Sequence, residues 1–196
     1  MRSSREDTEK HRQEIIAAAA RLFREKGADA VSVPELMQAV GMTHGGFYRH
    51  FASKDELIPL AYREAFDQIV ARLGKPGAGN DGGRTAAWNA MVNAYLSPEH
   101  RDNIGDGCAA ASLAGDAARL EPDSASHRAF QDGISRMVER AQSRQEGPDA
   151  HQEGLIALST LVGVLVLARG TEGELSDAFL EAARDHLLKP EPAGKR

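Results

Sequence analysis

The sequence predicts an all-α protein of about nine helices, arranged as an N-terminal three-helix domain and a larger C-terminal helical domain. Three observations support this prediction. Apolar residues recur at spacings of three and four along most of the chain, as on the buried face of an amphipathic helix. Serine or threonine precedes several of these runs, and glycine follows them, as at helix ends. No stretch alternates apolar and polar residues over the length of a strand.

The first two helices have clear start and stop signals. An apolar stripe predicts the first helix over Glu9–Lys26, and Gly27 follows as the residue whose freedom at positive φ ends it. The second helix opens at Ser32. Its hydroxyl can accept from the Glu35 N–H while the Glu35 carboxylate reaches back, the arrangement called a capping box. Gly41 is expected to stop this helix.

Two further helices follow closely. A short third helix is expected from His44 to His50, with Thr43 as its N-cap. Ser53 and Glu56 form a second capping box, which starts a fourth helix that continues to residue 73. A helix, a glycine turn, a capped short helix, a sharp turn and a second short helix make up helix-turn-helix architecture. We therefore predict a helix-turn-helix domain over residues 1–56, joined onward through the helix 57–73.

The rest of the chain predicts a second helical domain over residues 84–189. Residues 74–83 (GKPGAGNDGG) are rich in glycine and predict a linker. The tail, residues 190–196, is expected to be disordered. The helices expected in between cover residues 85–96, 106–120, 124–144, 149–169 and 174–188.

Charge and composition disfavour a secreted or membrane protein, but they neither establish nor exclude DNA binding. The net charge of −5 belongs to the part after residue 56, because residues 1–56 hold equal numbers of acidic and basic side chains. A neutral segment can bind phosphates when its cations share one face. The N-terminus lacks the apolar core of a secretory signal, and the most apolar stretch, Leu155–Ala168, is shorter than the ~20 residues that span a bilayer. We expect a cytoplasmic protein without membrane contact.

The string VSVPELMQAVGMTHGGFYRHFASKDEL, from Val31 to Leu57, resembles the DNA-binding signature of the TetR/AcrR family of transcriptional regulators in residue type and spacing. The agreement extends back through EIIAAAARLFREKG in the first helix. The resemblance implies a homodimeric repressor that binds a palindromic operator in double-stranded DNA. It further implies that a small apolar or amphipathic effector releases the repressor from its operator. No cofactor is expected.

The spacing of the third helix predicts which of its side chains face DNA. Phe47 and Phe51, four residues apart, are expected to face inward, and the side chains between them outward. His44 at the helix start is either a base contact in the major groove or an exposed surface residue. Tyr48 is either a DNA contact or a half-buried core aromatic, and glycines beside His44 would let the backbone approach DNA closely.

The resemblance also implies individual contacts. Tyr48 and His50 match positions that contact phosphate or bases in the family, and Lys54 and the start of the second helix match phosphate contacts. Lys54 could equally be an ordinary exposed lysine, and the role of Arg49 is open. The complete predicted DNA-binding set is Ser32, Val33, Thr43, His44, Gly45, Gly46, Tyr48, Arg49, His50 and Lys54.

The C-terminal helices predict two further sites. The dense apolar faces of the last two helices either form a dimer interface, as the family resemblance implies, or complete the monomer's core; they are Leu155, Leu158, Leu161, Val162, Leu165, Leu175, Phe179 and Ala182. Apolar stripes on earlier helices are either plain core or the lining of an effector pocket; the pocket candidates are Trp88, Met91, Val92, Tyr95, Cys108, Phe130, Ile134 and Met137.

Three alternative functions compete with this interpretation. Cys108, the single cysteine, precedes a predicted helix, where its thiol is either a buried small hydrophobe or the sensor of an electrophile-responsive or redox-responsive repressor. An all-helical enzyme is disfavoured because no catalytic triad, phosphate-cradling loop or zinc spacing stands out, so no catalytic or metal site is expected. An architectural DNA-binding protein would not need a second domain of this size.

Overall fold

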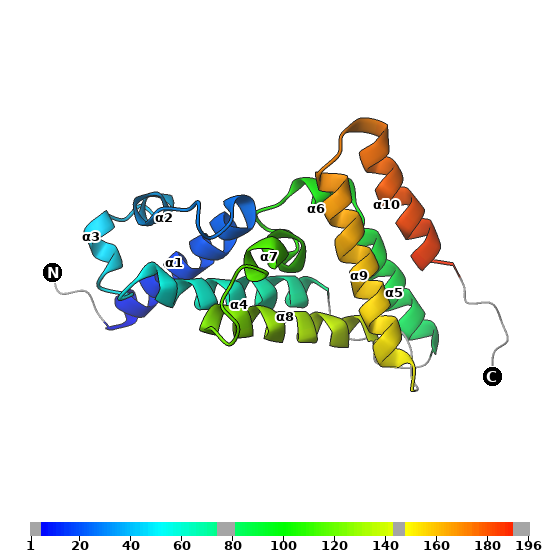
Figure 1. Cartoon of the computed structure of the whole chain (residues 1–196), viewed down its shortest axis with the longest axis horizontal. Helices are drawn as coiled ribbons and strands as arrows, with labels where there is room; N and C mark the ends of the chain where they lie inside the picture. The colour runs from blue at the N-terminus through cyan, green and yellow to red at the C-terminus, as the bar shows by residue number, and fades with distance from the viewer. Residues whose placement is uncertain (1–4, 74–80, 143–147, 190–196) are drawn as a thin grey trace. The chain divides into compact units, whose positions relative to one another are not determined.

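A computed structural model describes residues 5–73, 81–142 and 148–189, and the regular structure in these ranges is entirely α-helical (Figure 1). The all-α prediction is confirmed, with ten helices among the described residues instead of about nine. The helices are α1 (Arg5–Lys26), α2 (Val33–Ala39), α3 (His44–Phe47), α4 (Lys54–Arg72), α5 (Asp81–Tyr95), α6 (Pro98–Asp102), α7 (Ala109–Ala117), α8 (Ala125–Gln142), α9 (Ala150–Arg169) and α10 (Gly173–Leu187).

The helix boundaries differ from the predictions at several points; α3 ends at Phe47 instead of His50, and α7 is shorter than the predicted helix 106–120. α1 begins at Arg5, because the charged residues before Glu9 continue the helix without adding to its buried stripe. The five-residue α6 was missed; although Ser97 caps it by accepting from the His100 N–H at 3.2 Å, it is too short to show periodicity. The last three residues of the predicted linker are already helical in α5. Residues 74–80 and the tail 190–196 lie outside the described residues.

The chain folds as two compact units, and their division does not follow a single cut in the sequence. The first unit holds residues up to 72 together with residues 104–136, and the second holds residues 73–103 and everything after 136. The first unit therefore contains α1–α4, α7 and most of α8. The second contains α5, α6, α9, α10 and the last turns of α8.

The core of the first unit lies between α1 and α4. The stripe predicted on α1 is buried, with Ile15 and Phe23 fully inaccessible, and it packs against Tyr62 and Phe66 of α4. Burying a side chain of this size contributes about 1.5–3 kcal/mol. The ring of Phe66 also meets the ring of Phe130 on α8 edge to face, with centroids 5.5 Å apart.

A buried arginine joins α1 to the segment before α7. Arg24 is 3% exposed, and its Nε donates to the Gly105 carbonyl oxygen at 2.6 Å while Nη2 donates to Gln68 Oε1 at 2.7 Å. Burial lowers the pKa of Arg24 to about 10, so the guanidinium stays charged at neutral pH. At the other end of α7, Asp116 Oδ2 accepts from the Ala28 N–H at 3.0 Å. These hydrogen bonds hold residues 105–116 against the C-terminal end of α1.

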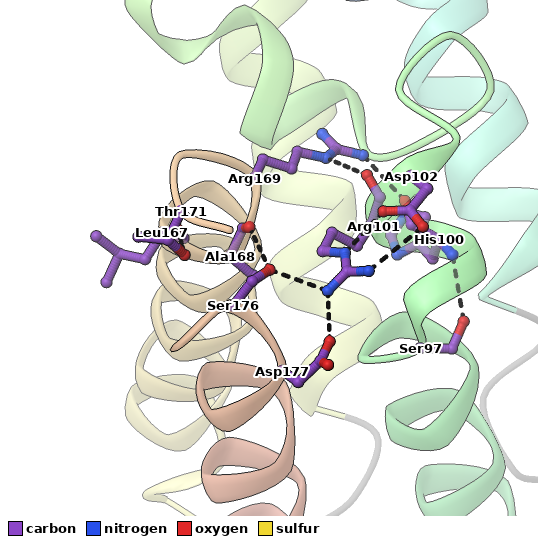
Figure 2. Close-up of polar contacts among 10 residues, drawn as sticks. All are labelled: Ser97, His100, Arg101, Asp102, Leu167, Ala168, Arg169, Thr171, Ser176 and Asp177. Atoms are coloured by element: carbon purple, nitrogen blue, oxygen red, sulfur yellow. Dashed lines mark hydrogen bonds and ion pairs between the residues drawn. The ribbon is translucent and has the colours of Figure 1, made fainter. Parts of the chain in front are cut away.

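In the second unit, a polar cluster joins α6 to the turn between α9 and α10 (Figure 2). Arg101 Nη1 donates to Ser176 Oγ at 2.9 Å and to Asp177 Oδ1 at 2.7 Å. The buried Ser176 hydroxyl in turn donates to the Ala168 carbonyl oxygen at 2.6 Å. Arg169 Nε donates to the Arg101 carbonyl oxygen at 3.0 Å. Every one of these groups is paired, so the cluster fixes the α9–α10 hairpin to α6.

Candidate nucleic-acid interface

The turn that leads into α2 is capped by one half of the predicted capping box. Ser32 Oγ accepts from the Glu35 N–H at 3.3 Å, as predicted. The Glu35 carboxylate does not reach back; it accepts from Lys26 Nζ at 2.6 Å, which holds the pKa of Glu35 below its usual value. The capping box is therefore wrong in its second half, because a lysine at the end of α1 offers a charged donor. Ser32 remains exposed and Val33 is half-buried.

The short α3 begins after an extended Thr43, at φ −82° and ψ 150°. Thr43 is at the N-cap position, as predicted, but its hydroxyl accepts no capping hydrogen bond. Its carbonyl oxygen accepts from the Gly46 N–H at 2.9 Å. A β-carbon at Gly45 would meet no atom within 4 Å, and one at Gly46 would lie 3.5 Å from Met37 Cε. Gly45 therefore faces open space, where a DNA backbone has room to approach.

Phe47 and Phe51 lie inward and Tyr48 and Arg49 outward, as the spacing predicts, whereas His50 is half-buried. Phe47 and Phe51 are 0% and 2% exposed, whereas Tyr48 between them is 60% exposed, which excludes the half-buried core alternative. His44 and Arg49 are also exposed. The rings of His44 and Tyr48 meet edge to face with centroids 5.7 Å apart, so they share one surface.

Lys54 is less exposed than the ordinary surface lysine that one prediction allowed, and its phosphate contact stays a prediction. It is half-buried, and its Nζ donates to the Asp29 carbonyl oxygen at 3.3 Å, which ties the start of α4 to the loop between α1 and α2. Next to it, Ser53 Oγ accepts from the Glu56 N–H at 3.3 Å, and Glu56 Oε2 accepts from the Ala52 N–H at 2.7 Å. The second capping box is thus present in a variant form, and Lys54 carries a structural hydrogen bond as well as a positive charge.

The match to known proteins is concentrated in this part of the chain. Residues 15–60 match the family model of bacterial regulatory proteins of the tetR family. The chain is 36% identical over 61 residues to the HTH-type transcriptional repressor KstR2 of Mycobacterium tuberculosis, a match over 31% of this chain and 30% of that repressor. A longer match, 26% identical over 167 residues, joins 81% of this chain to 84% of an uncharacterized HTH-type transcriptional regulator of the same species.

Solved structures extend the likeness over the whole fold. A TetR transcriptional regulator from Chloroflexus aurantiacus superposes with a TM-score of 0.75 at 23% identity, covering 93% of this chain and 94% of that one. The reduced form of Escherichia coli NemR gives a TM-score of 0.72 at 19% identity, covering 92% and 95%. Residues 15–60 thus carry the DNA-binding region of the tetR family, and the described residues have the fold of TetR-family structures.

The likeness to curated relatives is uneven along the chain. It spans about a third of the length of the first relatives that it matches. The relatives are named as transcriptional regulators and repressors, and the TetR family is a family of regulators, not of enzymes. The enzyme interpretation is therefore set aside.

The predicted effector residues divide between the two units. Cys108, Phe130 and Ile134 belong to the first unit, and the other five to the second. Trp88 lines a partly open cavity of about 110 Å³ within the second unit, and its Nε1 donates to the Leu187 carbonyl oxygen at 3.0 Å. None of the other seven lines this cavity, whose lining is Trp88, Ala141, Gln142, Glu153, Ile156, Ala157, Thr160, His186 and Leu187.

Sequence reasoning missed the polar part of this lining. Gln142, Glu153, Thr160 and His186 come from three helices and show no shared spacing, whereas the prediction followed apolar stripes. Most of those stripes belong to the interior: Val92, Tyr95 and Met137 are each at most 3% exposed. Met91 is half-buried.

Cys108 is fully buried at the position that precedes α7. An electrophile cannot reach a thiol that is 0% exposed unless the surrounding residues open. Burial agrees with the small-hydrophobe alternative, and the electrophile-responsive repressor stays a prediction.

The predicted dimer residues divide between the interior and the surface of the second unit. Leu158, Leu161 and Leu165 are 7%, 2% and 0% exposed, so this part of the predicted interface packs inside the unit itself. Val162 and Phe179 are half-buried and Ala182 is exposed. The exposed large apolar side chains of α9 and α10 are Leu155, Ile156, Val166, Leu167 and Leu175, each 45–58% exposed; we call them the apolar face.

The α9 part of the apolar face lies on one side of the helix, in two groups near its two ends. Leu155 and Val166 are three helical turns apart, as are Ile156 and Leu167, so all four lie on one side of the helix. By length and hydropathy α9 could also cross a membrane, with 28% of its most apolar window buried, but one such helix is weak evidence for a membrane protein.

Proposed function

We propose that the protein is a sequence-specific DNA-binding transcriptional repressor, which binds a palindromic operator as a cytoplasmic homodimer and is released by a small-molecule effector. The observation that carries this proposal is the exposed surface of α3. Tyr48 is 60% exposed on a helix whose neighbouring aromatics are buried, and His44 and Arg49 share its surroundings. Aromatic, imidazole and guanidinium groups are those that contact phosphates and base edges.

The apolar face supports the dimer. Exposed large apolar side chains that gather on one side of a soluble protein mark interaction sites. A second copy of the same face is the occupant that the resemblance to TetR-family regulators favours, since two-fold dimers bring together identical surfaces. A dimer would present two α3 helices to two half-sites of one operator, which a monomer cannot do.

The cavity supports binding of a small molecule in the second unit. Trp88 and Ile156 offer apolar contact, whereas Glu153 and His186 offer polar contact, so the lining suits an amphipathic molecule. Release requires that the effector bind the DNA-free state more tightly than the DNA-bound state. Because Trp88 is the single tryptophan, its fluorescence reports directly on an occupant.

Selection of duplexes from a random-sequence library tests the DNA-binding part. The protein should enrich a palindromic sequence, and fluorescence anisotropy should show saturable binding that unrelated DNA does not displace. Tyr48→Ala should weaken this binding at least tenfold without changing the thermal unfolding midpoint. Gln131→Ala, at an exposed residue of α8 in the same unit, is the matched control and should bind as the wild type does. Failure to enrich any sequence would contradict the proposal.

Sedimentation equilibrium tests the dimer. Leu175→Glu places a charge in the apolar face and should yield monomers that lose cooperative binding to the palindrome, whereas Ala94→Glu, at an exposed residue of α5, should remain dimeric. A monomeric wild type, or a dimeric Leu175→Glu variant with intact binding, would count against this interface. A reporter gene behind the selected sequence then separates repression from activation.

A further inference from the structure

Four cationic or titratable side chains gather where the N-terminal half of α1 meets the residues after α3. They are His11 and Arg12 on α1, and Arg49 and His50 directly after α3. The rings of His11 and His50 meet edge to face, with centroids 6.3 Å apart. Both histidines are half-buried, so part of each ring remains accessible. His11 lies outside the part of the chain in which the sequence pattern predicts DNA contacts.

The surroundings of His50 favour its neutral form in the free protein. Its Nδ1 is buried and has no hydrogen-bond partner among the described residues. Burial lowers the pKa of His50, and the positive neighbours His11, Arg12 and Arg49 lower it further, while Glu9 on α1 opposes them. The Phe51 ring, 6.5 Å away between centroids, adds an apolar wall.

Arg12 is held in place beside this pair. Its guanidinium carbon lies 4.5 Å from the centre of the Phe51 ring, and Nη2 lies 3.5 Å from Glu56 Oε1. The guanidinium therefore contributes a fixed positive charge beside the pair. The guanidiniums of Arg12 and Arg49 are offset by the carboxylates of Glu9 and Glu56, so the charges around the two imidazoles balance when the histidines are neutral.

We propose that His11 and His50 together bind one backbone phosphate of DNA, and that this contact takes up a proton. The inference rests on the proposed function, and it adds a contact from α1 and a dependence on pH. A phosphate beside the pair adds a negative charge and favours the imidazolium form, whose accessible ring edge can donate to it.

The sign of the pH dependence follows from linkage. The DNA complex holds more protons than the free protein, so affinity rises as pH falls through the region around the ordinary histidine pKa of about 6.5. For one proton taken up, the dissociation constant falls by up to about tenfold for each pH unit within this window. Above the window both forms of the protein are neutral at the pair, and the dependence disappears.

Anisotropy titrations of the selected duplex between pH 5.5 and 8.0, at constant ionic strength, test the proposal. The wild type should bind more tightly at low pH, and His11→Gln and His50→Gln should each remove most of this dependence. Gln131→Ala, at an exposed residue of α8 in the same unit, is the control. It should leave both the affinity and the pH dependence unchanged.

Two further readouts separate a phosphate contact from a structural role. At pH 6, His50→Gln should reduce the slope of log affinity against log salt by about one, as expected when one phosphate contact is lost. The imidazole proton resonances of His11 and His50 should titrate at higher pH with the duplex bound than without it.

The proposal is overturned if the wild type binds the duplex with the same pH dependence as the double variant His11→Gln/His50→Gln, or if the two resonances do not shift. These outcomes leave the DNA-binding function intact. Absence of binding at every pH would instead contradict the proposed function itself.

Discussion

Replacing Gly133 by alanine tests how closely α8 approaches α4. Alanine is the better helix former by about 1 kcal/mol, so an unobstructed replacement in the middle of a helix should stabilise the protein. At Gly133, however, the new β-carbon would lie 2.5 Å from Phe66 Cδ1 and still closer to Cγ and Cδ2. Carbon atoms in contact are normally about 3.5–4.0 Å apart. Phe66 is fully buried against Phe130, so its ring cannot turn away without repacking.

Overpacking of this kind costs about 1–3 kcal/mol or more, which outweighs the gain in helix propensity. We expect Gly133→Ala to unfold about 2–8 °C below the wild type in a thermal melt at fixed protein concentration. Gly115→Ala is the matched control. Its β-carbon in α7 would meet nothing nearer than Arg119 Nη1 at 3.9 Å, so this variant should melt about 2–4 °C above the wild type. The reasoning is refuted if the two variants melt at the same temperature.

Two hydrogen bonds between distant segments give further predictions. Asp116→Ala removes the acceptor of the buried Ala28 N–H and should lower the free energy of unfolding in urea by about 1–2 kcal/mol. Asp116→Asn keeps an acceptor oxygen and should lose less than half of that, so equal losses would argue against a role for this hydrogen bond. Trp88→Phe leaves the Leu187 carbonyl oxygen without its indole donor and should cost about 1 kcal/mol or more. An unchanged urea midpoint would mean that water replaces the donor without loss.

The local features of the DNA-binding region could be predicted from the sequence. Gly27 and Gly41 end their helices at φ +83° and +69°, in the left-handed region that glycine occupies without strain. The division between buried Phe47 and exposed Tyr48 followed from their positions on a helical turn. These features depend on residues at most four positions apart, which the sequence displays directly.

Partners that are distant in the sequence were decided by the tertiary structure. Glu35 accepts from Lys26 instead of capping its own helix, and Lys54 donates to the Asp29 carbonyl. In each case the local pattern allowed the side chain more than one role. The tertiary structure brought a charged or carbonyl partner within hydrogen-bond distance, and the side chain pairs with it. The pairing of His11 with a histidine after α3 likewise depends on how the helices cross.

The C-terminal helices show most clearly what a sequence pattern leaves undecided. The spacing of Leu158, Leu161 and Leu165 established one buried stripe on α9, but a stripe does not state which surface covers it. The fold covers that stripe within the second unit and leaves Leu155 and Leu167 exposed. The spacing of apolar residues predicts that a helix has an apolar side, since that property depends on the sequence of one helix alone. The choice between the monomer's interior and a partner's surface depends on the positions of the other helices.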